Sequence, residues 1–217
     1  MDKVTEACEQ MDLSWVKDRV GSFTLQMDRC DDEKAYRLFH YENDLGWRWE
    51  ALYDREVEDY TVHISMPLFS FTDISFIRQE PESYLAGLRE RCEAGLTMAL
   101  VEPDKSFTHA YKAKKLPQWQ WQSFLPTLID DYQLDITPDR AIRMINGSYI
   151  IAEYRRKEDR SGLLLFYNVL RDEFFAELRR HNHPEISHEL DARTLPSLEK
   201  ALTQHLERIL KELTTRL

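Results

Sequence analysis

The last helix predicted in this chain has a weaker copy in the first half, and this repetition constrains the fold more than any other feature. The helix is predicted over residues 194–217, with Thr194 placed to cap it and Pro196 in its first turn. Its apolar residues recur mainly at steps of three and four and so share one helix face: Leu198, Leu202, Leu206, Ile209, Leu210, Leu213 and Leu217. The copy begins at Pro81 and closes near Val101.

An offset of 114 residues also relates the strands predicted before the two helices. Tyr60, Val62 and Ile64 match Phe174, Ala176 and Leu178. Each trio alternates with other residues at a period of two, as a strand with one buried face requires. Because two elements of different period keep one offset, the pattern indicates that a single unit has been duplicated.

Short alternating segments separated by turns rich in Asp, Asn and Gly favour an antiparallel meander in each half. In the first half, a helix over 2–19 precedes strands at 22–28, 35–41, 47–53 and 60–66, with a short extra strand at 71–77. In the second half, a helix over 119–132 precedes strands at 141–145, 149–154, 163–169 and 174–180. Asn146-Gly147 predicts a tight hairpin in which both turn residues have positive φ.

The sequence therefore predicts an α+β fold of two tandem units packed as an internal pseudo-dimer. Each unit is a helix, a four-stranded antiparallel meander and a second helix. The predicted units are residues 1–103 and 118–217, joined by a basic connector over 104–117. One compact domain is the alternative, because a chain of 217 residues suits either arrangement.

Composition and cysteine usage predict a cytoplasmic protein. Apolar residues make up 42% of the chain, which supports a core without disulfides or metals. The three cysteines show no CxxC spacing, and an odd, unpatterned count indicates a reducing compartment. No segment approaches the roughly 18 continuous apolar residues of a membrane span. The first 18 residues are acidic and amphipathic, unlike a targeting peptide.

A basic and aromatic stretch provides one candidate binding site. Residues 105–122 contain four lysines and no acid, although the chain carries a net charge of −10. The candidate residues are Lys112, Lys114, Lys115, Trp119 and Trp121, extended by Arg155 and Arg156. Lysines that follow phosphates and rings that stack on bases are typical of single-stranded nucleic-acid binding. In the alternative interpretation the tryptophans pack and the lysines are solvated, and the net charge disfavours nucleic acid.

A duplicated unit of a four-stranded meander and a helix resembles, in topology alone, the PUR-alpha and Whirly groups of single-stranded nucleic-acid binders. No motif of those groups is recognised in this sequence, so the resemblance acts at the level of the fold.

A histidine cluster provides the candidate metal site. His181 and His183 share one face at the end of a predicted strand, and His188 follows as a third ligand. Three histidines can hold a zinc ion with one open position, which would make the protein a metal-dependent enzyme. The alternative is a solvated turn, because the spacing matches no zinc signature and HExxH is absent.

The remaining features favour a protein without catalysis. The sequence has no GxSxG, P-loop or GxGxxG motif, and it has only six glycines to cradle a phosphate. The leading hypothesis is a non-enzymatic interaction module, chaperone-like or adaptor-like, without a cofactor. It would bind a partner protein, or a second copy of itself, through a sheet face or a helix groove.

Overall fold

The computed structural model describes residues 3–181 and 183–215. Predictions that fall on Asp2, Asn182, Arg216 and Leu217 lie outside these residues. The fold is α+β, with helices and two antiparallel sheets of seven strands each. The chain divides into two compact units, residues 1–101 (unit 1) and residues 102–217 (unit 2), and each is described by itself.

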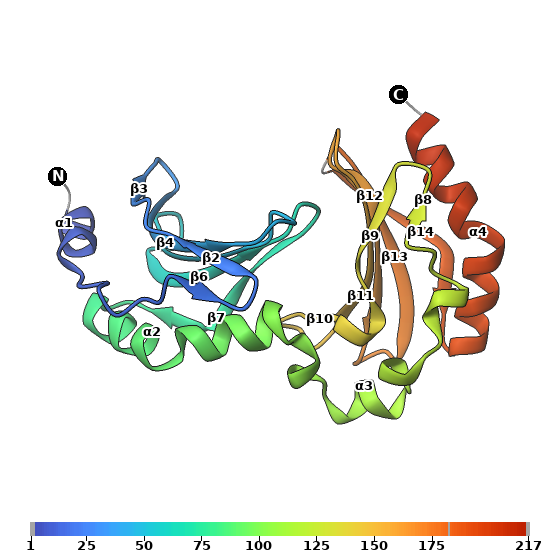
Figure 1. Ribbon diagram of the computed structural model, residues 1–217, viewed down its shortest axis with the longest axis horizontal. Helices are drawn as coiled ribbons and strands as arrows, with labels where there is room; N and C mark the ends of the chain where they lie inside the picture. The colour runs from blue at the N-terminus through green and yellow to red at the C-terminus, as the bar shows by residue number, and fades with distance from the viewer. Residues whose placement is uncertain (1–2, 182, 216–217) are drawn as a thin grey trace. The chain divides into compact units, whose positions relative to one another are not determined.

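Unit 1 is a single sheet with a long helix along one face (Figure 1). Its elements are α1 (Lys3–Gln10), β1 (Arg19–Val20), β2 (Phe23–Gln26), β3 (Cys30–Asp31), β4 (Ala35–Glu42), β5 (Arg48–Asp54), β6 (Asp59–Ser65), β7 (Ser70–Arg78), α2 (Pro81–Leu96) and the π-helical turn η1 (Thr97–Val101). The strand order is β1-β2-β4-β5-β6-β7, and β3 pairs with β4.

Helix α2 forms where the sequence predicts it. Proline stands at its start, and the side chains of Tyr84, Leu88, Cys92 and Leu96 are buried on one face. The Tyr84 hydroxyl donates a hydrogen bond to the carbonyl oxygen of Thr61 in β6. The helix therefore seals the apolar face of the unit 1 sheet.

Unit 2 has a sheet with the same strand order, preceded by a run of short helices (Figure 1). Its elements are η2 (Pro103–Ser106), α3 (His109–Ala113), η3 (Leu116–Gln118), η4 (Trp121–Ser123), β8 (Leu128–Ile129), β9 (Tyr132–Ile136), η5 (Pro138–Arg140), β10 (Ile142–Arg143), β11 (Tyr149–Arg156), β12 (Ser161–Asn168), β13 (Glu173–Arg180), β14 (His183–Ala192) and α4 (Leu195–Thr215). The order is β14-β13-β12-β11-β9-β8, with β10 paired to β11.

The core of unit 2 lies between its sheet and α4. The apolar face of α4 contributes the buried residues Leu198, Leu202, Leu206, Ile209, Leu210 and Leu213. The segment predicted as a basic connector supplies Phe107, Tyr111 and Leu116 to the same core. These residues are buried because the short helices fold back against the sheet.

Both sheets contain the same break in register next to the outermost strand. In unit 1, Tyr60 pairs with Arg78 and Val62 with Asp73, so residues 74–77 of β7 lie opposite Thr61 alone. In unit 2, Phe174 pairs with Ala192 and Ala176 with Ser187, so residues 188–191 of β14 lie opposite Phe175 alone. Such bulges bend a strand and end its regular pairing.

The structure corrects three sequence-based expectations of the helices and sheets. Each sheet has seven strands rather than four, because the two-residue strands have no detectable period and the bulges disrupt the period of β7 and β14. The helix predicted over 119–132 is instead η4 followed by β8 and the start of β9. Pro126 interrupts that pattern, since proline cannot donate within a helix. The first helix, α1, ends at Gln10 rather than near residue 19.

The predicted Asn-Gly hairpin connects β10 and β11, with a wider turn than expected. Gly147 has φ +79°, but the φ of Asn146 is not positive. The Met144 amide donates to the Ser148 carbonyl oxygen, which closes the turn. None of the described helices combines the length and apolar character needed to cross a membrane.

Candidate interaction surface

Strand β14 forms an edge of the unit 2 sheet. Among the described residues it pairs only with β13, in a regular register from His183 to Ser187. The opposite edge of β14 therefore offers backbone groups to another strand, except that Pro184 has no N–H to donate. Helix α4 packs closely against β14 (Figure 1), so this edge runs beside a helix.

A groove separates the β13–β14 hairpin from the C-terminal half of α4. Its lining combines the apolar residues Leu178, Ile209 and Leu213 with charged residues of β13, β14 and α4. Its volume of about 280 Å³ falls just below the roughly 300–1,000 Å³ of small-molecule pockets. The groove therefore lies at the small end of the range of binding pockets.

An exposed apolar residue marks the same strand. Ile186 lies in β14 with 73% of its surface exposed. It pairs with Glu177, whereas its neighbours Glu185 and Ser187 pair with Leu178 and Ala176, which face α4. Directly paired residues share a face, so Ile186 projects from the face of the sheet opposite α4.

Carboxylates dominate the charge of β14. Glu185 is 3.2 Å from Nε of Arg180, and its side chain is 49% exposed. Asp191 is 2.8 Å from Nδ1 of His188, and Arg208 of α4 binds Glu189. The side chains of Glu189 and Asp191 are 44% and 45% exposed. The strand itself holds three carboxylates and neither lysine nor arginine, and the arginines that pair with two of them belong to β13 and α4.

The charge of the two units differs. Residues 1–101 contain 21 Asp and Glu against 11 Lys and Arg, so the net charge of −10 belongs to unit 1. Residues 102–217 contain 18 of each and are neutral overall. The potential at any surface of unit 2 is therefore set by local groups such as those of β14.

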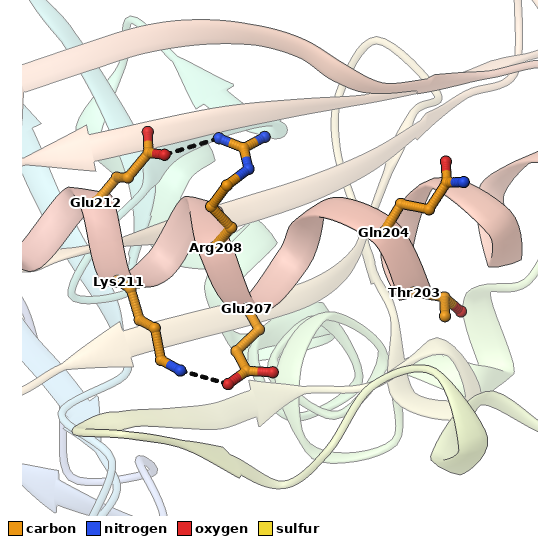
Figure 2. Close-up of a pocket in the computed structure, with 6 residues that line it drawn as sticks. All are labelled: Thr203, Gln204, Glu207, Arg208, Lys211 and Glu212. Atoms are coloured by element: carbon orange, nitrogen blue, oxygen red, sulfur yellow. Dashed lines mark hydrogen bonds and ion pairs between the residues drawn. The ribbon is translucent and has the colours of Figure 1, made fainter.

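The outer face of α4 carries a second, shallower depression. Figure 2 shows Glu207 paired with Lys211 and Arg208 paired with Glu212 along this face, with Thr203 and Gln204 one turn earlier. Pairs four residues apart are the usual arrangement on a solvated helix. Glu212 also lines the groove beside β14, so the two depressions share one wall.

Lys114, one of the lysines in the predicted basic stretch, links separate segments of unit 2. The Lys114 ammonium donates to Oδ1 of Asp172 at 2.5 Å and to the Arg193 carbonyl oxygen at 2.8 Å. It also lies 5.6 Å and 5.7 Å from the ring centres of Tyr167 and Phe174. The bond from Lys114, with a second from Tyr167, lowers the pKa of the Asp172 carboxyl.

The predicted tryptophans lie apart from the exposed lysines. Trp119 is buried, and its Nε1 donates to Oε1 of Glu199 in α4 at 2.9 Å. Trp121 is half-buried and packs against the unit 2 core. Lys112 and Lys115 are exposed. The sequence stretch therefore divides into packed rings and solvated lysines.

The two predicted arginines are engaged within the unit 2 sheet. Arg155 is nearly buried and donates from Nε to Oδ2 of Asp135 at 2.6 Å. Arg156 donates to both carboxylate oxygens of Asp159 and lies over the Tyr132 ring. The nucleic-acid hypothesis stays a prediction, with three of its five cations bound to carboxylates.

The three predicted metal ligands lie at different points along the β13–β14 hairpin. His181 occupies the β13–β14 turn with φ +47°, and His183 begins β14. His188 lies in the bulge and contacts Asp191. Within the described part of the chain, no group of three or more His, Cys, Asp or Glu side chains gathers to hold a metal ion. The metal hypothesis stays a prediction.

Sequence reasoning missed β14 and also a charged network on the unit 1 sheet. The network joins Arg37 to Asp28 at 2.8 Å and to Glu50 at 3.3 Å. The buried ring of His40 lies 3.0 Å from Asp28 and 3.4 Å from Glu42. Polar residues inside the apolar segments of β4 and β5 were the available signal. For β14, the available signal was the alternation of Ile186, Leu190 and Ala192 with polar residues.

Comparisons with known proteins returned no family model, no curated protein and no solved structure that matches this chain.

Proposed function

We propose that this protein is a non-enzymatic, cytoplasmic interaction module that binds an extended segment of a partner protein along β14, in a chaperone-like or adaptor-like role. The observation that carries the proposal is the one-sided pairing of β14 beside the groove that α4 forms. A strand added there would satisfy backbone groups on β14 and place alternate side chains beside α4.

The dimensions of the surface support a polypeptide rather than a metabolite as ligand. The regular part of β14, from His183 to Ser187, is long enough for a short strand pairing. The groove next to it accepts side chains, and the exposed Ile186 provides an apolar contact on the other face. Main-chain bonds supply affinity in such complexes, and side-chain positions supply specificity.

The proposal includes duplication of one sheet-and-helix unit, with the two copies paired as a pseudo-dimer. Three observations support duplication: the shared strand order, the offset of 114 residues between β7 and β14, and the common register break. A protease site inserted between residues 101 and 102 tests the pairing. The cleaved halves should remain associated in gel filtration, and separate elution would contradict the pseudo-dimer.

A peptide selection tests the proposed function. Random peptides displayed on phage would be selected on the immobilised full chain, and the best sequences would be synthesised and titrated. Hydrogen exchange should show new protection of the β14 amides in the complex, because an added strand covers them. Replacing Ile186→Ser should weaken binding by roughly threefold to tenfold, because a bound peptide would cover only part of this apolar side chain.

A matched variant distinguishes binding at this surface from nonspecific apolar binding elsewhere. Leu170 lies between β12 and β13 and is 84% exposed. Leu170→Ser should leave binding unchanged. Selected peptides that protect other amides, or a selection that yields no binding sequence, would overturn the proposed function.

A further inference from the structure

We infer that the segment taken up by β14 is a basic one, with lysine or arginine at alternate positions facing α4 and apolar residues at the positions between them. The inference rests on the proposed function and names the class of partner. It follows from the carboxylates of β14, from the faces that its residues occupy and from the charges beside it.

The negative charge beside the edge is accessible to a partner. Glu185, Glu189 and Asp191 are each nearly half exposed. Arginines hold Glu185 and Glu189 in place, and the His188 ring contacts Asp191. A carboxylate fixed by one cation keeps lone pairs for a second. Basic side chains of an added strand can therefore bind without reorganising the site.

The two faces of β14 define a pattern in the partner. Glu185 pairs with Leu178 on the α4 side, and Ile186 pairs with Glu177 on the other side. An added strand keeps this alternation, because successive side chains point to opposite faces. A basic residue opposite Glu185 should then be followed by an apolar residue opposite Ile186.

A second copy of this chain offers no opposite charge to this edge. Within the regular stretch of β14, a two-fold antiparallel pairing centred on Glu185 places the two copies of Glu185 opposite each other. Centring the pairing on Ile186 places Glu185 opposite Ser187, without a pair of opposite charges. Because like charges directly opposite each other destabilise a sheet, a basic strand complements Glu185 better than a second copy does.

Three synthetic peptides test the inference with the full chain. The first alternates lysine and valine, the second alternates glutamate and valine, and the third has the composition of the first in blocks without alternation. Fluorescence anisotropy should show the first binding roughly tenfold tighter than the others, because several half-exposed ion pairs act together. The advantage should shrink from about 0.05 M to about 0.5 M sodium chloride, since these pairs are screened.

Charge-removing variants locate the effect. Glu185→Gln should reduce the preference for the lysine peptide severalfold. The control, Asp139→Asn, removes an exposed carboxylate in η5, which precedes strands on the far side of the sheet. It should leave the preference unchanged, and an equal loss in both variants would show a general charge effect and overturn the inference.

The outcomes separate this inference from the proposed function. Equal binding of the lysine and glutamate peptides at β14 would overturn the basic partner and leave strand addition intact. Library-selected peptides that protect β14 but lack basic residues would do the same. Failure of every peptide, selected or designed, to protect β14 would overturn both.

Discussion

The ammonium of Lys114 lies 2.5 Å from Oδ1 of Asp172, a contact that joins α3 to the turn between β12 and β13. The lysine side chain is only 17% exposed, and two aromatic rings lie beside its charge. Lys114, which the sequence suggested as a ligand contact, therefore stabilises the packing of unit 2.

Replacing Lys114→Met should destabilise the protein by about 1–2 kcal/mol, because the packed stem is kept while the hydrogen bonds and the cation–π contacts are lost. Urea unfolding followed by circular dichroism measures this. The neighbouring exposed residue supplies the control, and Lys112→Met should change stability by less than about 0.5 kcal/mol. Equal effects of the two substitutions would contradict the structural role of Lys114.

Acid should weaken the protein partly through Asp159. Hydrogen bonds from the Arg156 guanidinium are the main cause that lowers the pKa of this carboxyl to about 2, from an ordinary 3.8. A folded-state pKa below the unfolded value stabilises the protein fully above about pH 4, and this stabilisation is lost as the pH falls toward about 2.

Asp159→Asn should therefore cost about 1–2 kcal/mol at neutral pH and much less near pH 2. Unfolding free energies of both proteins across this pH range measure the difference. Asp131, which is exposed, gives the control Asp131→Asn. A penalty for Asp159→Asn that stays constant down to pH 2 would contradict the assignment.

Thiol reactivity should distinguish the three cysteines. Cys30 is exposed, whereas Cys8 and Cys92 are buried. Burial raises the pKa of the Cys92 thiol to about 12, which leaves almost no thiolate at neutral pH. A thiol reagent should therefore modify one cysteine rapidly in the native protein and all three after unfolding. Cys30→Ser should remove the rapid phase, and its persistence would place an accessible thiol elsewhere.

Two glycines of α2 should respond to alanine in opposite directions. A Cβ on Gly95 would lie 2.9 Å from Cζ of the buried Phe76, so Gly95→Ala should cost about 1–3 kcal/mol. A Cβ on Gly87 would meet only the mobile end of Arg91 at 3.5 Å. Gly87→Ala should stabilise the helix by about 0.5–1 kcal/mol. Thermal unfolding measures both, and stabilisation by Gly95→Ala would contradict the close approach.

Single-stranded nucleic acid should bind weakly or not at all. Lys114, Arg155 and Arg156 are bound to carboxylates, which leaves Lys112 and Lys115 as the exposed cations of the predicted set. A fluorescent oligonucleotide titrated at low and high salt checks this. Salt-dependent binding that Lys112→Ala reduces would restore the nucleic-acid hypothesis.

Elements with one clear period could be predicted from the sequence. Helices α2 and α4 show steps of three and four residues, and strands β4, β5, β6, β12 and β13 lie within two residues of their predicted positions at each end. Their local pattern and their tertiary burial agree, which is the condition under which such prediction works. The same agreement placed Leu88 and Leu202 on the buried helix faces.

Other elements were hidden by conflicts between local pattern and tertiary packing. Trp121, Phe124 and Leu125 follow a helical spacing, but Leu125 is buried as part of an irregular segment that covers the sheet. In β14, Ile186, Leu190 and Ala192 alternate with polar residues, but the register break puts Leu190 and Ala192 in the core and leaves Ile186 exposed. Periodicity alone therefore could not show which residues of the strand face the core.

The register break shared by β7 and β14 limits how far another molecule can follow either strand. Beyond Asp73 and beyond Ser187 the ladder is interrupted, so only a handful of residues of an incoming segment can align before the backbone turns aside. Contacts of that length dissociate readily. The same interruption restrains the stacking of further strands on either edge, and with it growth into fibres.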